Sequence, residues 1–144
     1  MRTAKDDVIV FCSNAPMERQ QTLEAMGVRV ERLESDKPTG PAWTRVLLEN
    51  PRPGELPLDL VLKRLAEMDV ISVMLESGAQ LNSSALAGGH VDKLTLFYAP
   101  VFLGGAGVPM TQGSVTGLVI AGTPTITLIG HDLRVDAYLR NPWE

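Results

Sequence analysis

The feature that most constrains the fold is a short apolar run that ends at an acidic residue and leads through a small-residue turn into a helix. It reads ISVMLESGAQLNSSAL and spans residues 71–86. Residues 71–75 are rich in bulky and β-branched side chains, and the run is short enough to be a strand buried on both faces. Glu76 ends the run, and residues 77–78 permit a sharp turn. The pattern predicts a central parallel strand followed by a helix over 79–86.

The start of this predicted helix is a candidate anion-binding site. The first-turn N–H groups of a helix have no partners within the helix, and the positive end of the helix dipole lies at the same point. A phosphate at the carboxyl end of a parallel sheet fits such a helix start. Polar residues also gather there, namely Gln80, Asn82, Ser83 and Ser84. Many α/β domains have a glycine turn of this kind for packing alone, so the pattern is compatible with both interpretations.

The bulk properties exclude several classes of function. A chain of 144 residues fits a single domain. Its net charge is −4 and its Lys and Arg residues form no cluster, which argues against nucleic-acid or acidic-membrane partners and favours a small soluble one. The single Cys12 excludes an internal disulfide and a zinc site built from cysteine pairs. A polar start and the lack of an apolar run of about 18 residues predict a soluble, cytoplasmic protein.

The first half of the chain predicts alternating strands and helices. An apolar run at 8–11 predicts a buried strand, and a helix capped by Asn14 should follow and end at Met26. The alternation at 28–31 predicts a second strand. Residues 34–57 are rich in proline and glycine, which predicts a long loop excursion.

The region after this loop predicts an amphipathic helix and then several strands. Apolar residues recur at helical spacing from Leu58 to about Met68. Strands are expected over 94–99, 115–121, 125–129 and 133–139, and the last two should form a hairpin around Gly130 and His131. The whole pattern predicts one α/β domain over 1–144, with a mostly parallel sheet and antiparallel strands at its C-terminal edge.

Few residues are of types that could carry catalysis. His90 and His131 are the only imidazoles, and neither has a second metal-ligating residue at short spacing, so we expect no metal site and a loop or cap role for each. No nucleophile elbow or phosphate-binding lysine motif is present. The glycine-rich loop at 104–107 permits close approach of a ligand, although a plain turn explains it equally well. Glu76 is the strongest candidate, because a carboxylate at the tip of a central strand lies where ligands bind in open α/β sheets.

Two longer runs carry a resemblance to a known family. They are DLVLKRLAEMDVISVMLESGAQLNSSALAGGHVDKLTLFYAPVFLGG and HDLRVDAYLRNPW. These resemble the C-terminal reductase domain of the bifunctional riboflavin-biosynthesis deaminase/reductase, over about Val8 to Trp143. The resemblance implies a dihydrofolate-reductase-like three-layer α/β sandwich. It also implies NADPH-dependent reduction of 5-amino-6-(5-phosphoribosylamino)uracil to the ribitylamino product.

The resemblance also implies roles for particular residues. The residue that matches Glu76 contacts the substrate in that family. The turn and helix start hold the NADPH phosphates, which implies cofactor binding by Gly78, Ala79, Gln80, Leu81, Asn82, Ser83 and Ser84. Ser77 stands where family members usually have glycine, a mild change because one glycine and a hydroxyl can still form an anion-binding turn. No residue is implied as the catalytic acid.

The chain lacks other parts of the family pattern. Nothing matches the first strands of the reductase domain, its aspartate-containing substrate segment, the serine that meets the 2′-phosphate, or the zinc signature of the deaminase domain. We therefore expect a domain that is incomplete at its N-terminus and has a partner, either the missing N-terminal segment or a second copy in a homodimer. Two alternatives stay open: a non-catalytic nucleotide-binding or structural module, and a related reductase acting on another pteridine or pyrimidine.

Overall fold

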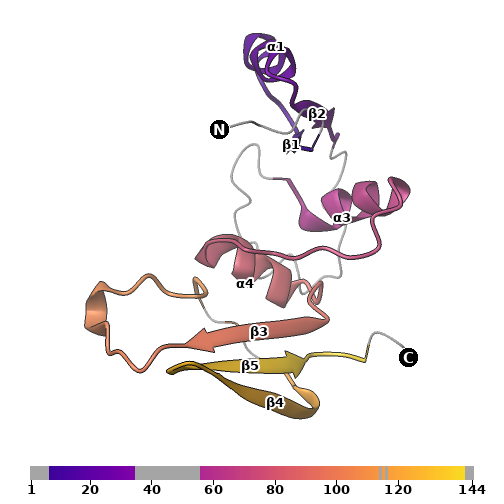
Figure 1. Ribbon diagram of the computed structural model, residues 1–144. Coiled ribbons are helices and arrows are strands. Elements are labelled where there is room, and N and C mark those ends of the chain that lie inside the picture. The colour runs from indigo at the N-terminus through magenta and orange to yellow at the C-terminus, as the bar shows by residue number, and fades with distance from the viewer. Residues whose placement is uncertain (1–6, 35–55, 114, 116, 142–144) are drawn as a thin grey trace. The chain divides into compact units, whose positions relative to one another are not determined.

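A computed structural model describes residues 7–34, 56–113, 115 and 117–141. The chain divides into two compact units, residues 1–73 and residues 74–144 (Figure 1). The predicted loop excursion at 34–57 lies, apart from its ends, outside the described residues. None of the helices in the described ranges has the length and apolar character needed to cross a bilayer.

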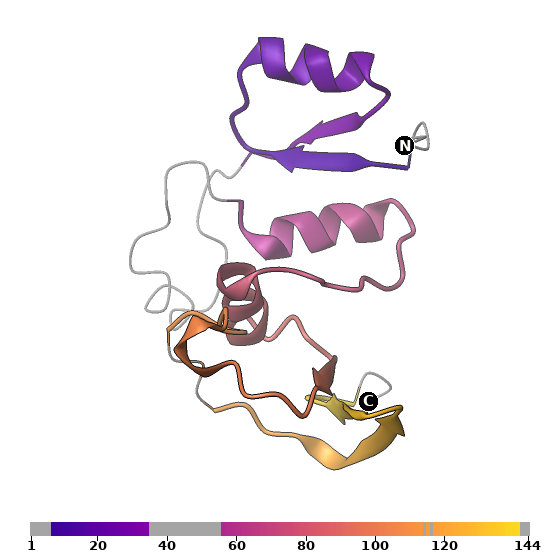
Figure 2. The same cartoon turned by 60° about the vertical axis from the view of Figure 1, so that its left-hand side comes forward.

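The first unit begins with a β-α-β arrangement. Strand β1 (Ile9–Cys12) and strand β2 (Arg29–Arg32) pair in parallel, with Ile9 opposite Arg29, and helix α1 (Met17–Ala25) connects them (Figure 2). A helical crossover is required here because parallel strands cannot be joined by a tight hairpin. Gly27, with φ of 81°, turns the chain from the helix into β2. Both predicted strands and the predicted helix are confirmed.

The predicted cap of α1 is wrong. Pro16, not Asn14, occupies the N-cap position, and its carbonyl accepts hydrogen bonds from the N–H groups of Arg19 and Gln20. The fixed φ of proline suits the start of a helix, so the helix begins directly after it. Asn14 is two residues too early to cap the first turn. Its Oδ1 instead accepts a hydrogen bond from Arg32 Nη2 at 3.4 Å.

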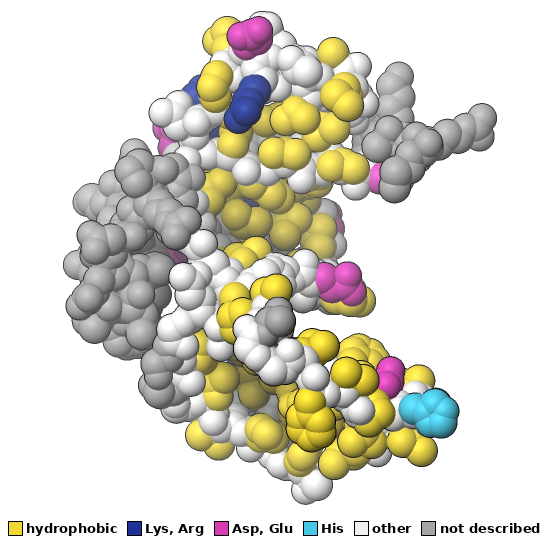
Figure 3. Space-filling model, turned by 90° about the vertical axis from the view of Figure 1, so that its left-hand side faces the viewer, with side chains coloured by type: hydrophobic (Ala, Val, Ile, Leu, Met, Phe, Trp, Pro, Cys, Tyr) yellow, Lys and Arg dark blue, Asp and Glu magenta, His cyan; other side chains and the backbone are white. Residues whose placement is uncertain are grey.

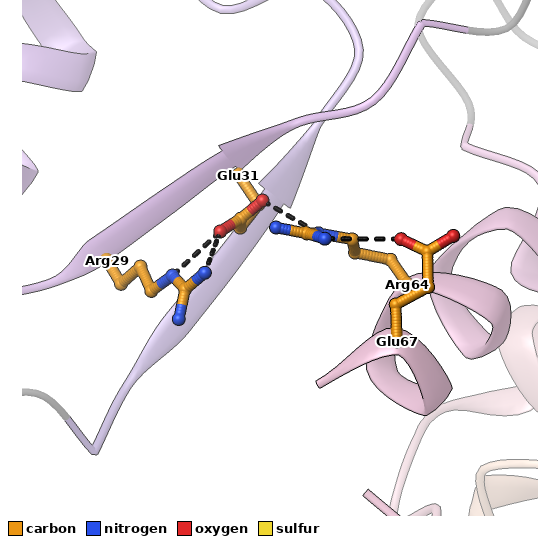
Figure 4. Close-up of polar contacts among 4 residues, drawn as sticks. All are labelled: Arg29, Glu31, Arg64 and Glu67. Atoms are coloured by element: carbon orange, nitrogen blue, oxygen red, sulfur yellow. Dashed lines mark hydrogen bonds and ion pairs between the residues drawn. The ribbon is translucent and has the colours of Figure 1, made fainter. Parts of the chain in front are cut away.

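Helix α3 (Leu58–Glu67) is joined to β2 by a chain of ion pairs (Figure 4). Arg64 donates to Glu31 at 3.0 Å and to Glu67 at 3.2 Å, and Arg29 also donates to Glu31. The hydrogen bond from Arg64 has the largest effect in lowering the pKa of Glu31, and the hydrogen bond from Arg29 has the second largest. The predicted amphipathic helix is thus confirmed, and its polar side is tied to the strand in the same unit.

The second unit contains helix α4 (Ala79–Ala87) and an antiparallel sheet. The strands β3 (Lys93–Tyr98), β4 (Ala121–Ile129) and β5 (Asp132–Tyr138) are arranged in the order β3-β5-β4, with β5 in the middle (Figure 1). Gly130, with φ of 63°, lies in the tight turn between β4 and β5. The helix over 79–86 and the C-terminal hairpin are therefore confirmed.

The two faces of this sheet differ in polarity because the strand register separates apolar from polar residues. Leu94 lies opposite Ala137 and Leu96 lies opposite Val135, which gives one apolar face. Few apolar side chains are buried: among the described residues they are Ala85, Leu86 and Ala137. Large apolar side chains are instead widely exposed at the surface (Figure 3).

A buried carboxylate organises the polar face. Asp136, 8% exposed, accepts hydrogen bonds from Arg134 Nε at 2.7 Å and Thr95 Oγ1 at 2.8 Å. Lys93 Nζ lies 3.1 Å from the same carboxylate and 5.6 Å from the centroid of the Tyr138 ring. The Arg134 and Thr95 hydrogen bonds lower the pKa of Asp136 from 3.8 to about 2. These contacts link β3 to β5 across the sheet.

The predicted central strand at 71–75 is wrong. The segment pairs with no strand of the described residues, and Ile71 is 99% and Met74 82% exposed. A strand exists only where a neighbour accepts and donates its backbone hydrogen bonds. Within the described parts of the chain, β1 pairs with β2 and β3 pairs with β5, and none of these strands pairs with residues 71–75. Apolar composition alone is therefore insufficient to form the strand.

The predicted strand at 115–121 is also wrong. In the part of it that the structure describes, residues 117–120 belong to no strand, and β4 begins only at Ala121. Gly117 and Gly122 have φ of 79° and 78°, values that interrupt an extended ladder. The register of β4 against β5 also shifts between Ala121 and Thr125.

Candidate functional site

The candidate site is the N-terminus of α4. Gly78 is the N-cap residue, with φ of −80° and ψ of 172°, and no side chain caps the first turn. The turn therefore does not require the left-handed conformation that a glycine permits. A Cβ placed on Gly78 would meet no atom within 4 Å, so the space that a side chain at this position would take is open. The uncapped N–H groups and the open approach together fit a phosphate group.

The polar side chains near the helix start bond to the protein itself. Asn82 Nδ2 donates to the carbonyl oxygens of Met110 at 2.9 Å and Ser77 at 3.3 Å, and Asn82 Oδ1 accepts from Ser77 Oγ at 2.7 Å. Ser83 Oγ donates to the carbonyl of Gln112 at 2.9 Å and accepts from the N–H of Gln112 at 2.7 Å. An anion at this site would therefore meet the backbone of the first turn rather than these side chains.

The side chain of Ser84 bonds within its own helix. Ser84 Oγ donates to the carbonyl of Gln80, one turn earlier in α4, at 3.2 Å. This bond from a serine to the carbonyl four residues before it is common within helices. Ala79, Gln80 and Leu81 occupy the first turn itself, and Gln80 and Leu81 are exposed. The seven residues predicted for the cofactor thus form one turn and the start of α4.

Glu76 lies two residues before the N-cap. Its side chain is exposed and makes no ion pair with any residue that the structure describes. An exposed, unpaired carboxylate can accept hydrogen bonds from the hydroxyl groups of a ligand without first losing a protein partner. Glu76 follows a segment that belongs to no strand, whereas the sequence predicted that it lies at the tip of a central strand; its role at the site stays a prediction.

The glycine-rich loop and the two histidines noted in the sequence lie in turns or at the end of a helix. The loop at 104–107 contains a short 3₁₀ helix, η1 (Gly104–Ala106), in which Gly104 has φ of 60°. The N–H of His90 donates to the carbonyl of Ala85 at 3.0 Å and so caps the end of α4, while His131 lies in the hairpin turn. The described residues contain no group of three or more metal-ligating side chains.

Sequence reasoning missed the segment from Met110 to Gln112. This segment lies in neither a helix nor a strand, yet it contacts the first turns of α4 through Asn82 and Ser83. Its contacts use backbone atoms and span almost thirty positions of the chain. No periodicity or local motif marks such a contact, because the partner is chosen by tertiary structure. The only sequence signal was the polar character of Asn82 and Ser83.

Comparison with known proteins places the chain in a family. Residues 1–130 match the family described as the RibD C-terminal domain. The chain belongs to this family. It is 27% identical over 159 aligned positions to the riboflavin biosynthesis protein RibD of Actinobacillus pleuropneumoniae, an alignment that covers 99% of the chain and 42% of that protein. The family named from sequence motifs is therefore confirmed.

A second sequence match and a solved structure show how much of this chain resembles known proteins. The chain is 46% identical over 48 residues to the 2,5-diamino-6-ribosylamino-4(3H)-pyrimidinone 5′-phosphate reductase of Methanothermobacter thermautotrophicus, covering 33% of the chain and 22% of that protein. The solved structure of Acinetobacter baumannii RibD, form 2, superposes with a TM-score of 0.63 at 19% identity, covering 91% of the chain and 30% of that protein. The superposition shows a shared α/β fold. In the described residues of this chain, one sheet has two parallel strands and the other has three antiparallel strands, so the predicted mostly parallel sheet is wrong, whereas the predicted antiparallel strands near the C-terminus are confirmed. The chain spans less than half the length of these proteins.

Proposed function

We propose that this chain takes part in NADPH-dependent reduction of a ribosylaminopyrimidine phosphate in riboflavin biosynthesis. The proposed reaction converts 5-amino-6-(5-phosphoribosylamino)uracil to the ribitylamino product. The main support is the family match over residues 1–130, together with a relative whose name specifies reduction of a ribosylaminopyrimidine phosphate. The exposed Glu76 and the uncapped start of α4 supply groups of the kind that such a substrate and cofactor need.

Each group would have a separate task. NADPH, when bound, supplies the hydride for the reduction. The backbone N–H groups of residues 79–81 would bind its phosphates at the open face in front of Gly78. Glu76 would accept hydrogen bonds from the hydroxyl groups of the sugar and so orient the carbon that is reduced. Asn82 and Ser83 would support this site through their bonds to Met110 and Gln112. The Ser84 hydroxyl bonds to the Gln80 carbonyl within α4 and has no role in this proposal.

The proposed active form includes a partner. Large apolar side chains are exposed in both units, among them Ile71 and Phe102, and one edge of β1 and one edge of β3 have no partner strand in the described residues. Exposed edges and apolar surface of this extent are usually covered. We propose that a second copy, or a preceding segment of the reductase, covers them. Light scattering that shows a folded monomer of the 144-residue chain would contradict the homodimer.

The test of the proposed function separates substrate from cofactor. Glu76→Gln keeps the shape of the side chain and removes its charge. NADPH affinity should be retained, while turnover should fall by roughly 10- to 100-fold, as expected if one charged hydrogen bond of about 1.5–3 kcal/mol is lost in the transition state. Glu18→Gln, at an exposed position of α1, is the matched control and should leave both quantities unchanged.

Two results would count against this assignment. Loss of NADPH binding in Glu76→Gln, with folding intact, would place the carboxylate at the cofactor instead of the substrate. No fluorescence or thermal-shift response of the unmodified chain to millimolar NADPH would favour the alternative, a non-catalytic structural or nucleotide-binding module. The unpaired segment at 71–75 is the observation that gives this alternative weight.

A further inference from the structure

We infer that Asn82 and Ser83 are positioning residues that fasten the segment 110–112 across the first turns of α4 and thereby hold the phosphate-binding backbone in place. This inference rests on the proposed cofactor site, which it deepens by separating residues that contact the cofactor from residues that support it. Residues 110–112 and the side chains of Asn82 and Ser83 together form a clamp.

The serine of the clamp satisfies both backbone groups of one residue. Ser83 Oγ accepts from the N–H of Gln112 at 2.7 Å and donates to its carbonyl at 2.9 Å. The same N–H also lies 3.3 Å from the carbonyl of Ala79 in the first turn of α4. The hydroxyl accepts and donates through one oxygen atom, and the methyl group of alanine can do neither, so alanine should break this contact and threonine should keep it.

The asparagine of the clamp joins the segment to the turn before the helix. Its Nδ2 donates to Met110 on one side and to Ser77 on the other, at 2.9 Å and 3.3 Å, and its Oδ1 accepts from Ser77 Oγ. Both donor hydrogens are therefore in use. Asn82 could bind a phosphate only by releasing the segment or the turn, which favours a supporting role over direct contact.

The clamp contacts the start of α4, where the proposed cofactor would bind. The N-cap Gly78 provides no side-chain cap, so the conformation of the helix start depends on contacts from elsewhere. The clamp holds residue 77 on one side of the N-cap and residues 79, 82 and 83 on the other. Donors that are held in the binding geometry before the ligand arrives bind it more tightly, because less ordering remains to be done.

The experiment compares two neighbouring serines in the full-length chain. Ser83→Ala removes the clamp hydroxyl, whereas Ser84→Ala removes a hydroxyl that bonds only within α4. Amide hydrogen exchange, measured without cofactor, should show the Gln112 N–H exchanging at least about 10-fold faster in Ser83→Ala and unchanged in Ser84→Ala. NADPH affinity should fall about 3- to 10-fold in Ser83→Ala, as for the loss of one or two hydrogen bonds, and should be unchanged in Ser84→Ala.

The test also needs the variant Ser83→Thr and a measurement of the unfolding free energy of each variant. Ser83→Thr keeps the hydroxyl and should restore both the slow exchange and the affinity. Urea unfolding is measured for each variant, and affinities are compared under conditions where each is fully folded. A fall in affinity with unchanged Gln112 exchange would show direct contact and overturn the positioning role. Faster exchange with unchanged affinity, or equal effects of Ser83→Ala and Ser84→Ala, would overturn it as well.

Failure of the proposed function gives a different result. If the unmodified chain does not bind NADPH, the cofactor site is wrong and so is the positioning role. The exchange of Gln112, measured without cofactor, still decides in that case whether Ser83 holds the segment.

Discussion

The two glycines that flank α4 should respond oppositely to substitution by alanine. Gly78 precedes the helix with φ of −80° and has open space where a Cβ would lie. Gly89 follows the helix with φ of 67°, in the left-handed region. Its N–H donates to the carbonyl of Leu86, and the next N–H, from His90, donates to Ala85, which is the Schellman arrangement that ends many helices. We expect Gly78→Ala to affect ligand binding and Gly89→Ala to affect folding.

The expected size of each effect follows from these geometries. In Gly78→Ala, the poorer cap costs about 0.5–1 kcal/mol, and the reduced entropy of the unfolded chain offsets about 0.4–1 kcal/mol, so the unfolding free energy should change by less than about 0.5 kcal/mol. The new methyl group would occupy the space that a phosphate needs, and NADPH affinity should fall about 10-fold, equivalent to about 1.4 kcal/mol. Gly89→Ala should lower the unfolding free energy by about 1–2 kcal/mol, because alanine is strained at a left-handed position.

The assays are urea unfolding followed by circular dichroism, and NADPH titration under conditions where both variants are fully folded. Gly89→Ala serves as the control for stability, since it should keep the affinity of the unmodified chain. If Gly78→Ala lost as much stability as Gly89→Ala while its NADPH affinity stayed the same, the predicted role of Gly78 in ligand binding would be wrong. That outcome would make the turn at Gly78 a purely structural feature.

Two further predictions concern folding. Leu86 is 6% exposed and Leu81, on the same helix, is 40% exposed, so Leu86→Ala should lower the unfolding free energy by about 2–3 kcal/mol and Leu81→Ala by less than about 1 kcal/mol; equal losses in urea unfolding would contradict the assigned core. Because Arg134 and Thr95 lower the pKa of Asp136 from 3.8 to about 2, the stabilisation from this carboxylate should be complete above its unfolded pKa and decline as the pH falls from about 3.8 to about 2. Asp136→Asn should remove that decline, so the unfolding free energies of the two proteins should converge at about pH 2, and a constant difference from pH 7 to pH 2 would show that the carboxylate's charge contributes nothing.

Local patterns in the sequence predicted several elements and the family correctly. The apolar run that became β1, the spacing of leucines in α3, and the small-residue turn before α4 each depend on neighbours within a few positions. The hairpin around Gly130 is equally local, because a two-residue turn determines which strands pair. The order of motifs around Glu76 identified the family, and the match over residues 1–130 confirmed it.

Contacts between distant positions could not be predicted in this way. Residues 71–75 have the composition of a buried strand, but a strand needs hydrogen-bonding neighbours, and composition does not supply them. The family resemblance implies that Asn82 and Ser83 take part in holding the NADPH phosphates, and this stays a prediction. In the structure their side chains bond to the backbone of Met110 and Gln112, almost thirty positions away, and the sequence does not show these contacts. The sequence alone determined which residues form the helix start. Tertiary structure decided which of their polar groups are left for a ligand. The reason is that each donor or acceptor can bond only to the few partners that the fold brings within reach.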